Sequence, residues 1–247
     1  MRSSYEMNFV ESCVGCERRD EGLFCGLEAN ALRALDSIKF AASFPKGAML
    51  FIEGQAARGV FVLCTGGVKL SVCSGEAKVL ITQIADPGEL LGLCSTLSGQ
   101  PYEVTAETLS PCQVSFIRRE DFLRFLSSHP GAALHVAQLM SRNYRNAHEQ
   151  ARLLALSHSA AEKFARLLLE RCARHGRVTE RGIDLKLTLT HEELGQLIGA
   201  SRETVTRLIS EFKLEQIIQV KGATLVVLNI AALEARANNL PGELTHL

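Results

Sequence analysis

Residues 188–213 read TLTHEELGQLIGASRETVTRLISEFK, and this stretch decides the fold of the C-terminal part of the chain. Thr190 followed three residues later by Glu193 forms a capping box, which predicts a helix from about residue 191. Gly199 is expected to end that helix, and Ser201 is expected to cap a second one. Two short helices joined by a Gly-containing turn of about four residues are typical of a helix-turn-helix.

The second helix of this pair carries polar side chains at its N-terminal end, on the face opposite its apolar stripe. An Arg fork matches the O6 and N7 atoms of guanine, and a Glu carboxylate accepts from N4 of cytosine. Hydroxyl and backbone N–H groups at helix starts hold phosphates. Exposed helices often carry Arg and Glu without binding anything, but the whole order of capped helix, Gly turn, polar run and hairpin favours DNA binding. The residues predicted to contact DNA are Thr190, Ser201, Arg202, Glu203, Thr206 and Arg207.

The segments around this pair complete a compact domain. A helix is predicted from Ala160 to about His175, with Gly176 as its stop. Apolar runs at 217–220 and 224–228, separated by a turn at Lys221-Gly222, are typical of a β-hairpin. Residues 159–247 are therefore predicted to form a winged helix-turn-helix domain.

Upstream of that domain, residues 131–158 are predicted to contain one long helix, of about 26 residues and roughly 39 Å in length. Apolar residues recur along it at intervals of three and four, as in the seam of a coiled coil. Charged side chains on its other faces favour a helix that stands partly free and pairs with a second copy of the chain. Packing on its own chain is the alternative. The predicted dimer seam comprises Val136, Met140, Tyr144, Ala147, Ala151 and Leu154.

Residues 28–130 have a different character. After a short amphipathic helix up to Ile38, short runs rich in Val, Ile, Leu and Phe alternate with Gly and Pro as far as about Ile117. Many short strands at turn spacing are typical of a β-sandwich, barrel or roll. The sequence therefore predicts an N-terminal β domain that precedes the long helix.

Composition bounds the class of protein. The 247 residues include 27 Lys and Arg against 27 Asp and Glu, and 47% are hydrophobic, as in an ordinary globular protein. No apolar run approaches the roughly 20 residues that cross a bilayer, and the N-terminus has no signal-peptide core. We therefore expect a cytoplasmic protein without a membrane partner. The sequence shows no Walker-type loop, nucleophile elbow or paired-carboxylate motif, so we do not expect an enzyme.

Eight cysteines are many for a cytoplasmic chain. Reducing conditions there disfavour a disulfide framework, so clustered thiols more often mean metal binding or redox chemistry. Cys13, Cys16 and Cys25 are clustered in residues 1–27, a polar segment without periodicity. The remaining cysteines are scattered through apolar surroundings, where a Cys is by default a small buried hydrophobe.

Taken together, the β domain, the long helix and the run Ser201 to Arg207 resemble the Crp/Fnr family of bacterial transcription regulators. The resemblance covers about Glu28 to Leu233 and implies an α+β fold. Its parts would be a cyclic-nucleotide-binding-type β-roll, a dimerisation helix and a C-terminal winged helix-turn-helix. It also implies a homodimer that binds a palindromic promoter site and contacts RNA polymerase.

The family's cyclic-AMP receptors hold the nucleotide phosphate with an Arg-Ser pair about ten residues beyond a Gly-Glu-Leu segment. Here the corresponding stretch, Ser98 to Val104, has no Arg, and Glu103 would repel an anionic ligand. We therefore do not expect cyclic AMP to bind, despite the resemblance in fold.

The cysteines resemble those of the family's Fnr branch, which binds an oxygen-labile 4Fe–4S cluster. The resemblance implies Cys13, Cys16, Cys25 and Cys112 as ligands, and thiolate softness suits iron–sulfur or zinc. Eight residues separate Cys16 from Cys25, a longer gap than in enteric Fnr, but lengthening a loop costs little entropy. The alternatives are Cys94 as the fourth ligand, zinc, a thiol–disulfide switch, haem sensing of nitric oxide, or no effector.

Two further expectations follow from the resemblance. A cluster across the four thiols would tie the N-terminal segment to the roll and bias the long helix towards its DNA-competent, paired state. The pattern of Arg202, Glu203 and Arg207 matches cyclic-AMP receptors more than enteric Fnr, so half-sites should resemble TGTGA more than TTGAT. They should lie about one helical turn, roughly 34 Å, apart.

Overall fold

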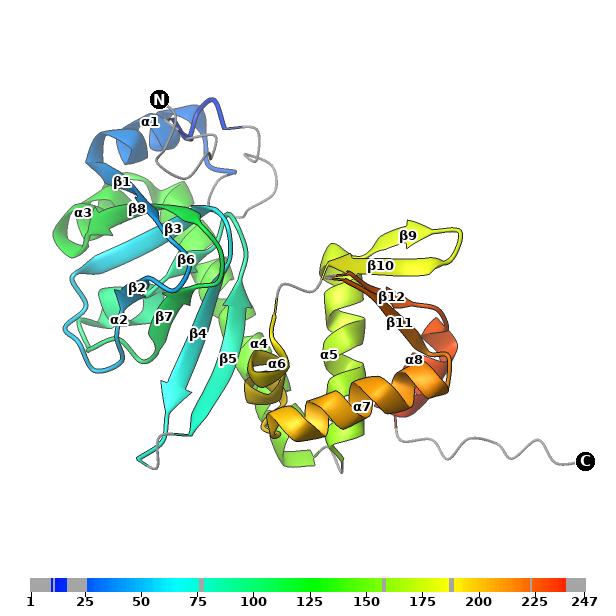
Figure 1. Cartoon of the computed structure of the whole chain (residues 1–247). Helices are drawn as coiled ribbons and strands as arrows, with labels where there is room; N and C mark the ends of the chain where they lie inside the picture. The colour runs from blue at the N-terminus through cyan, green and yellow to red at the C-terminus, as the bar shows by residue number, and fades with distance from the viewer. Residues whose placement is uncertain are drawn as a thin grey trace, which may run out of the picture. The chain divides into compact units, whose positions relative to one another are not determined.

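A computed structural model of the chain describes residues 10, 12–16, 26–75, 78–156, 159–186, 189–222 and 224–238. Cys25, one of the predicted ligands, lies outside these residues. The chain divides into two compact units, Met1–Ala147 and His148–Leu247 (Figure 1). The division falls within the long helix, so most of that helix groups with the β domain.

The first unit contains the predicted β-roll, built from two four-stranded sheets in which all paired strands are antiparallel. The first sheet has the order β1 (Lys39–Phe44), β8 (Cys112–Arg118), β3 (Gly59–Thr65) and β6 (Leu90–Leu91). The second has the order β2 (Met49–Phe51), β7 (Thr105–Thr108), β4 (Val68–Cys73) and β5 (Val79–Ala85). The predicted fold class is confirmed.

Side chains from both sheets fill the interior of the roll, and we call this set the inner cluster. Aromatic rings form much of it: Phe51 stacks on Tyr102 with ring centroids 4.1 Å apart, and Phe61 lies 5.4 Å from Phe51. The Tyr102 hydroxyl donates to the Gly59 carbonyl at 2.7 Å, so its polar end is satisfied although the residue is buried. The inner cluster comprises Phe51, Leu63, Val68, Ala85, Leu91, Tyr102, Ala106, Cys112 and Val114.

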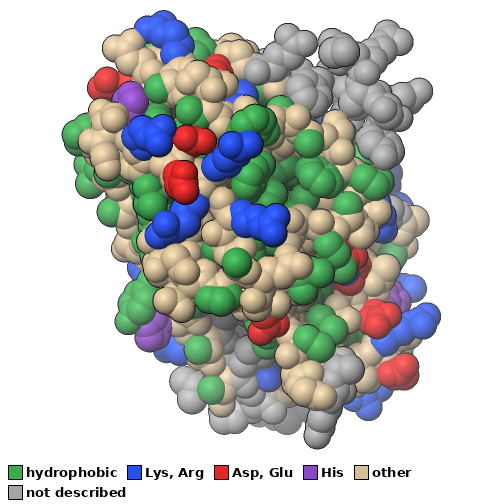
Figure 2. Space-filling model, turned by 90° about the vertical axis from the view of Figure 1, so that its left-hand side faces the viewer, with side chains coloured by type: hydrophobic (Ala, Val, Ile, Leu, Met, Phe, Trp, Pro, Cys, Tyr) green, Lys and Arg blue, Asp and Glu red, His purple; other side chains and the backbone are tan. Residues whose placement is uncertain are grey.

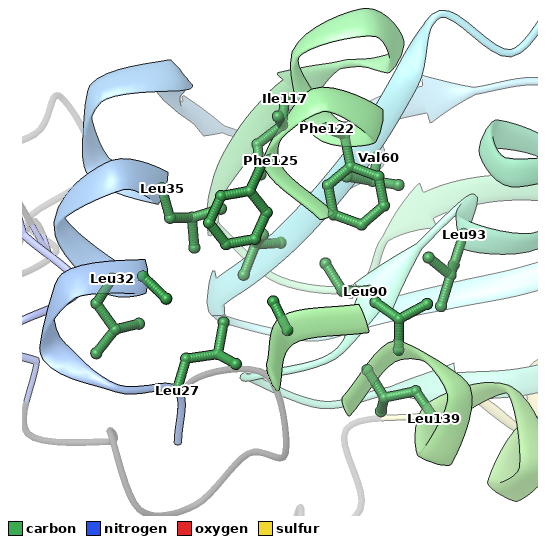
Figure 3. Close-up of a cluster of buried hydrophobic side chains, with 14 residues drawn as sticks. Leu27, Leu32, Leu35, Val60, Leu90, Leu93, Ile117, Phe122, Phe125 and Leu139 are labelled. Atoms are coloured by element: carbon green, nitrogen blue, oxygen red, sulfur yellow. The ribbon is translucent and has the colours of Figure 1, made fainter. Parts of the chain in front are cut away.

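The first sheet buries its other face as well. Helices α1 (Ala29–Ile38), α3 (Arg119–Ser128) and the start of α4 (Pro130–Leu156) pack on it, with Leu93 of α2 (Leu93–Ser98) (Figure 3). We call this set the outer cluster. It comprises Leu27, Ala31, Leu32, Leu35, Val60, Val62, Leu90, Leu93, Ile117, Phe122, Phe125, Ala132, Val136 and Leu139.

The second unit confirms the predicted helices within a residue or two. They are α5 (Ala160–His175), α6 (His191–Ile198) and α7 (Arg202–Leu214), followed by α8 (Ile230–Ala237). The predicted hairpin is half of a four-stranded sheet with the order β11 (Ile218–Lys221), β12 (Thr224–Val227), β10 (Gly182–Lys186) and β9 (Arg177–Thr179). The sequence did not predict β9 and β10, because both are short, contain charged residues and have mixed burial without a clear alternation.

The surface matches the balanced composition: in the face shown in Figure 2, Lys and Arg side chains are interspersed with Asp and Glu. None of the helices in the described residues has the length and apolarity that crossing a membrane requires.

Gly66 is required where the turn after β3 meets the start of β8. Its φ is +87°, and a Cβ there would lie 2.6 Å from the Pro111 carbonyl oxygen and against the Cys112 thiol. Gly54 has a similar φ of +82°, but a Cβ there would meet nothing within 4 Å. Gly66→Ala should therefore lower the free energy of unfolding by about 1–3 kcal/mol more than Gly54→Ala, since only it adds a clash. Denaturant unfolding measures the difference, and equal losses would contradict this packing.

Candidate nucleic-acid interface and sensory thiols

The turn between α6 and α7 depends on two glycines. Gly199 ends α6 in the left-handed conformation, with φ 66°. Gly195 lies in the last turn of α6, where a Cβ would come within 2.6 Å of the Ala200 carbonyl oxygen. The Ala200 N–H donates to the Gly195 carbonyl at 2.9 Å, which closes the turn. The backbone therefore fixes how α7 leaves α6.

Hydroxyl groups cap both helices. Thr190 Oγ1 accepts from the Glu193 N–H at 3.2 Å and donates to the Glu193 carboxylate at 3.0 Å, which confirms the capping box. Ser201 Oγ accepts from the Thr204 N–H at 3.2 Å. In this structure the hydroxyl hydrogen of Thr190 is used on Glu193, so a phosphate contact by this hydroxyl would require that bond to be exchanged, and the predicted contact stays a prediction.

The polar face of α7 is exposed as predicted. Val205, Leu208 and Phe212 are buried, and the Phe212 ring packs 5.6 Å from that of Phe164 in α5. A hydrogen bond from its own backbone N–H, helped by Ser201 and by the charge of Arg202, lowers the pKa of Glu203 below its usual value. Glu203 is therefore an ionised acceptor at neutral pH. The exposed side chains of this face are Arg202, Glu203, Thr206 and Arg207.

Sequence reasoning missed one residue beside this face. His191 is the first residue of α6, and its Nδ1 lies 2.9 Å from Thr206 Oγ1. The two residues are 15 positions apart, so only the packing of α6 on α7 brings them together. A polar residue at the first position of a helix that precedes a recognition helix was the available signal.

The N-terminal segment lies on the outer side of the first sheet. The Gln113 side-chain amide accepts from the Val10 N–H at 2.6 Å and donates to the Val10 carbonyl at 2.7 Å. The Asp36 carboxylate accepts from the Cys13 N–H at 2.9 Å and from the Ser12 hydroxyl at 2.7 Å. Cys13 and Val14 also pack against the outer cluster. The segment is thus fixed by polar and apolar contacts together.

Cys13 lies beside a partly buried ion pair. Lys39 Nζ forms a salt bridge with Asp36 and donates to Cys13 Sγ at 3.2 Å. Burial raises the pKa of the Cys13 thiol to about 12, although Lys39 acts in the opposite direction. Burial opposes ionisation of Asp36 as well, but hydrogen bonds from Lys39, Cys13 and Ser12 lower its pKa to about 2. In the metal-free protein Cys13 is therefore a protonated thiol next to a fixed positive charge.

Cys64 lies on the same side of the first sheet as Cys13. Its Sγ lies 3.5 Å from the Ser115 hydroxyl on β8. Burial raises the pKa of Cys64, whereas the hydrogen bond with Ser115 and the charge of Lys39 lower it, and Cys16 has a smaller raising effect. No sequence pattern groups Cys64 with Cys13 and Cys16, because only strand pairing brings residue 64 to this face.

Cys112 points to the opposite side. It is fully buried in the inner cluster, where its thiol donates to the carbonyls of Gly67 and Ser110 at 3.3 and 3.1 Å. Gln113, the next residue, faces the outer side, as alternation along a strand requires. Four cysteine thiolates are soft donors that suit an iron–sulfur cluster. In this conformation, however, Cys112 does not lie on the same side of the sheet as Cys13 and Cys16. Within the described part of the chain, no three His, Cys, Asp or Glu side chains are arranged to hold a metal ion.

The alternative fourth ligand, Cys94, lies elsewhere again. It is half-buried in α2, and its thiol contacts Met140 Sδ of α4 at 3.5 Å. Burial, with the charge of Glu103 second, raises its pKa.

The predicted dimer seam includes residues that pack within their own chain. Val136 is buried in the outer cluster and Met140 packs against it, so both face their own chain. Tyr144, Ala147 and Ala151 are exposed, and the side chain of Leu154 lies outside the described set. Leu134 and Ala137 are exposed too, and with Tyr144 and Ala151 they share one helical face. The helix α4 therefore carries a buried stripe and an exposed stripe side by side. Residues three and four positions apart occur in both stripes, so the spacing in the sequence assigned them to a single seam.

The chain is similar to known proteins over most of its length. The family model described as "Cyclic nucleotide-binding domain" matches residues 41–129, and "Crp-like helix-turn-helix domain" matches residues 162–236. The CRP-like cAMP-activated global transcriptional regulator of Mycobacterium tuberculosis is 26% identical over 218 residues, covering 87% of this chain and 96% of that protein. The transcriptional activator protein FnrA of Stutzerimonas stutzeri is 28% identical over 229 residues, covering 91% and 92% respectively.

Solved structures share the fold. FixK2 from Bradyrhizobium japonicum superposes with a TM-score of 0.71 at 22% identity, covering 80% of this chain and 96% of that one. A CooA mutant from Carboxydothermus hydrogenoformans superposes with a TM-score of 0.74 at 19% identity, covering 88% of this chain and 96% of that one.

The environment of Cys13 predicts its reactivity. Only the thiolate reacts with iodoacetamide, so a thiol whose pKa is about 12 should react slowly near neutral pH and faster as the pH rises. In metal-free protein at about pH 8, mass spectrometry should show Cys13 alkylated at least about tenfold more slowly than the exposed Cys73. Gln113→Ala, which removes both hydrogen bonds to Val10, should narrow that gap. Equal rates at the two cysteines in the unaltered protein would refute the described docking.

Proposed function

The chain belongs to the Crp/Fnr family of DNA-binding transcription regulators, and from this premise we propose that it is a homodimeric, cytoplasmic regulator that senses a redox signal through its N-terminal thiols. RNA polymerase would be its partner at promoters. The observation that supports the sensing part is the docking of Cys13 and Val14 against the outer cluster, to which the start of α4 also contributes.

The capped helix pair supports promoter recognition. Arg202, Glu203, Thr206 and Arg207 form one exposed polar face at the start of α7, while the opposite face is buried. A helix of this kind enters the major groove with its N-terminal residues against base edges. Arg202 and Arg207 would read guanines, and the ionised Glu203 would accept from a cytosine amino group.

For the sensory group we propose a 4Fe–4S cluster held by Cys13, Cys16, Cys25 and Cys112. When bound, such a cluster supplies oxygen-sensitive redox chemistry through thiolate-ligated iron. The hydrogen bonds between Gln113 and Val10 support Cys112, because they bring the N-terminal segment to the residue next to it. Taking that role requires the first residue of β8 to turn out of the inner cluster. Cys64, already on the outer side, is the rival.

The packing of the roll argues against a cyclic nucleotide as the effector. Tyr102 follows directly on the Ser98–Pro101 stretch, is buried, and stacks on Phe51 within the inner cluster. The same stretch carries no Arg to pair with a phosphate.

We further propose that the exposed face of α4, with Leu134, Ala137 and Tyr144, pairs with the same face of a second copy. A twofold dimer buries the same patch on both subunits, and a continuous helix face offers such a patch.

Iron analysis tests the ligand assignment. Anaerobically purified protein should contain iron and sulfide at about four each per chain, the content of one cubane cluster. Cys112→Ser should lose most of both, whereas Cys64→Ser and Cys73→Ser should retain them. Loss in Cys64→Ser with retention in Cys112→Ser would assign the fourth position to Cys64, and loss in Cys94→Ser would assign it to Cys94. No iron in any preparation would refute the cluster.

Selection of binding sites from random DNA tests the reading helix. We expect palindromes with TGTGA-like half-sites centred roughly 34 Å apart. Arg202→Ala should weaken binding to the selected site by about 1–3 kcal/mol and relax the preference at one base pair. A uniform loss across all sequences would make Arg202 a phosphate contact, and recovery of TTGAT-like half-sites would contradict the proposed pattern.

Sedimentation tests the proposed dimer face. Ala137→Glu would bury an unpaired charge in the contact, which costs several kcal/mol, so the variant should be monomeric. Leu139→Ala, two residues along the same helix, removes a buried side chain of the outer cluster instead. It should lower stability by about 2–5 kcal/mol yet leave the protein dimeric in the folded state. A dimeric Ala137→Glu variant would place the interface elsewhere.

A further inference from the structure

Thr206 occupies the middle of the exposed face of α7. On a helix of 3.6 residues per turn it has Arg202 and Glu203 one turn before it and Ser210 one turn after it. All four side chains are exposed. Whatever lies against this face in a complex therefore meets Thr206.

The hydroxyl of Thr206 is already engaged within the protein. It donates to the Arg202 carbonyl at 3.0 Å. A threonine hydroxyl has one hydrogen, so in the 2.9 Å contact with His191 the oxygen accepts and the imidazole Nδ1–H donates. Thr206 Oγ1 is thus held from two sides, by its own helix and by α6.

These two hydrogen bonds fix the orientation of the Thr206 side chain. Its methyl group takes no part in them. The neighbouring hydroxyl behaves alike, since Ser210 Oγ donates to the Thr206 carbonyl at 3.1 Å. Rotating Thr206 to offer its hydroxyl to DNA would break both of its hydrogen bonds. The methyl group is therefore the branch of this exposed side chain that makes no hydrogen bond within the protein.

We infer that Thr206 reads DNA through its methyl group, by contact with the C5 methyl of a thymine, and that His191 is the positioning residue that holds it so. The thymine methyl is the one apolar feature of the major groove, and Thr methyls contact it. The inference rests on the proposed function, in which α7 lies in that groove. It assigns to Thr206 one T·A pair of each half-site, beside the pairs read by Arg202, Glu203 and Arg207.

The test removes the thymine methyl and nothing else. Duplexes carrying the selected palindrome are prepared with each thymine in turn replaced by deoxyuridine in both half-sites, and dissociation constants are measured by fluorescence anisotropy at one salt concentration. One position should weaken binding by the unaltered protein, by about fourfold per half-site, the factor for one buried methyl group. Replacement at the other thymine positions serves as the control, because no contact with their methyl groups is proposed.

Variants of Thr206 then separate the methyl from the hydroxyl. Thr206→Val keeps a methyl and loses the hydroxyl, so it should retain the ratio between the thymine and deoxyuridine duplexes. Thr206→Ser keeps the hydroxyl and loses the methyl, so its ratio should fall to about one. His191→Ala should lower the ratio, and His191→Asn, which keeps a side-chain N–H, should restore part of it. A merely structural role for His191 would change the affinity for both duplexes equally.

The experiments distinguish failure of the proposed function from failure of the methyl contact alone. Absence of any selected site would refute the proposed function itself. Normal binding to the selected site with no loss at any deoxyuridine would overturn the methyl contact alone. So would a Thr206→Ser variant that keeps the ratio of the unaltered protein, or a Thr206→Val variant that loses it.

Discussion

The outer cluster is the constraint on which the first unit depends. Its buried residues come from the first sheet and from α1, α3 and α4 (Figure 3). Two further groups pack against them: Cys13 and Val14 of the N-terminal segment, and Met140 of α4. One apolar core therefore supports both the cysteines and the first half of the long helix. Neither can be repacked without affecting atoms that the other touches.

This arrangement gives a physical route from thiol chemistry to the long helix. Protein interiors are packed as densely as organic crystals, so a displaced side chain is accommodated by a shift of its neighbours rather than by empty space. Polar contacts with Asp36, Lys39 and Gln113 hold the N-terminal segment against the core, and they place the Cys13 thiol next to a Lys ammonium group. Converting that thiol into a metal-bound thiolate changes the charge that Lys39 faces. The helix that would receive the change, α4, also carries the exposed face proposed for pairing.

Local signals predicted the second unit well. Three short-range features occur at their predicted positions: the capping box at Thr190, the helix stop at Gly199 and the cap at Ser201. The strands β9 and β10 escaped prediction because three and five residues with mixed burial carry little periodicity. The contact between His191 and Thr206 depends on the crossing of two helices, which no single-helix pattern contains.

The sensory site was harder to predict, for three physical reasons. The partners of the N-terminal segment, Asp36 and Gln113, are 23 and 103 residues away from the groups they bind. The first sheet is buried on both faces, so β8 lacks the alternation of polar and apolar residues that would show which way Cys112 points. On α4 the buried stripe and the exposed stripe are adjacent, so a single seam through Val136, Met140 and Tyr144 mixed residues of both kinds.

The central claim is that the thiols and α4 are coupled through the outer cluster. Hydrogen–deuterium exchange on anaerobically prepared, iron-loaded protein, before and after exposure to air, tests it most directly. The account predicts that loss of the cluster changes amide protection in residues 12–16 and also in α1 and in α4 from Ala132 to Met140. A change confined to the N-terminal segment, with α1 and α4 unaffected, would contradict it.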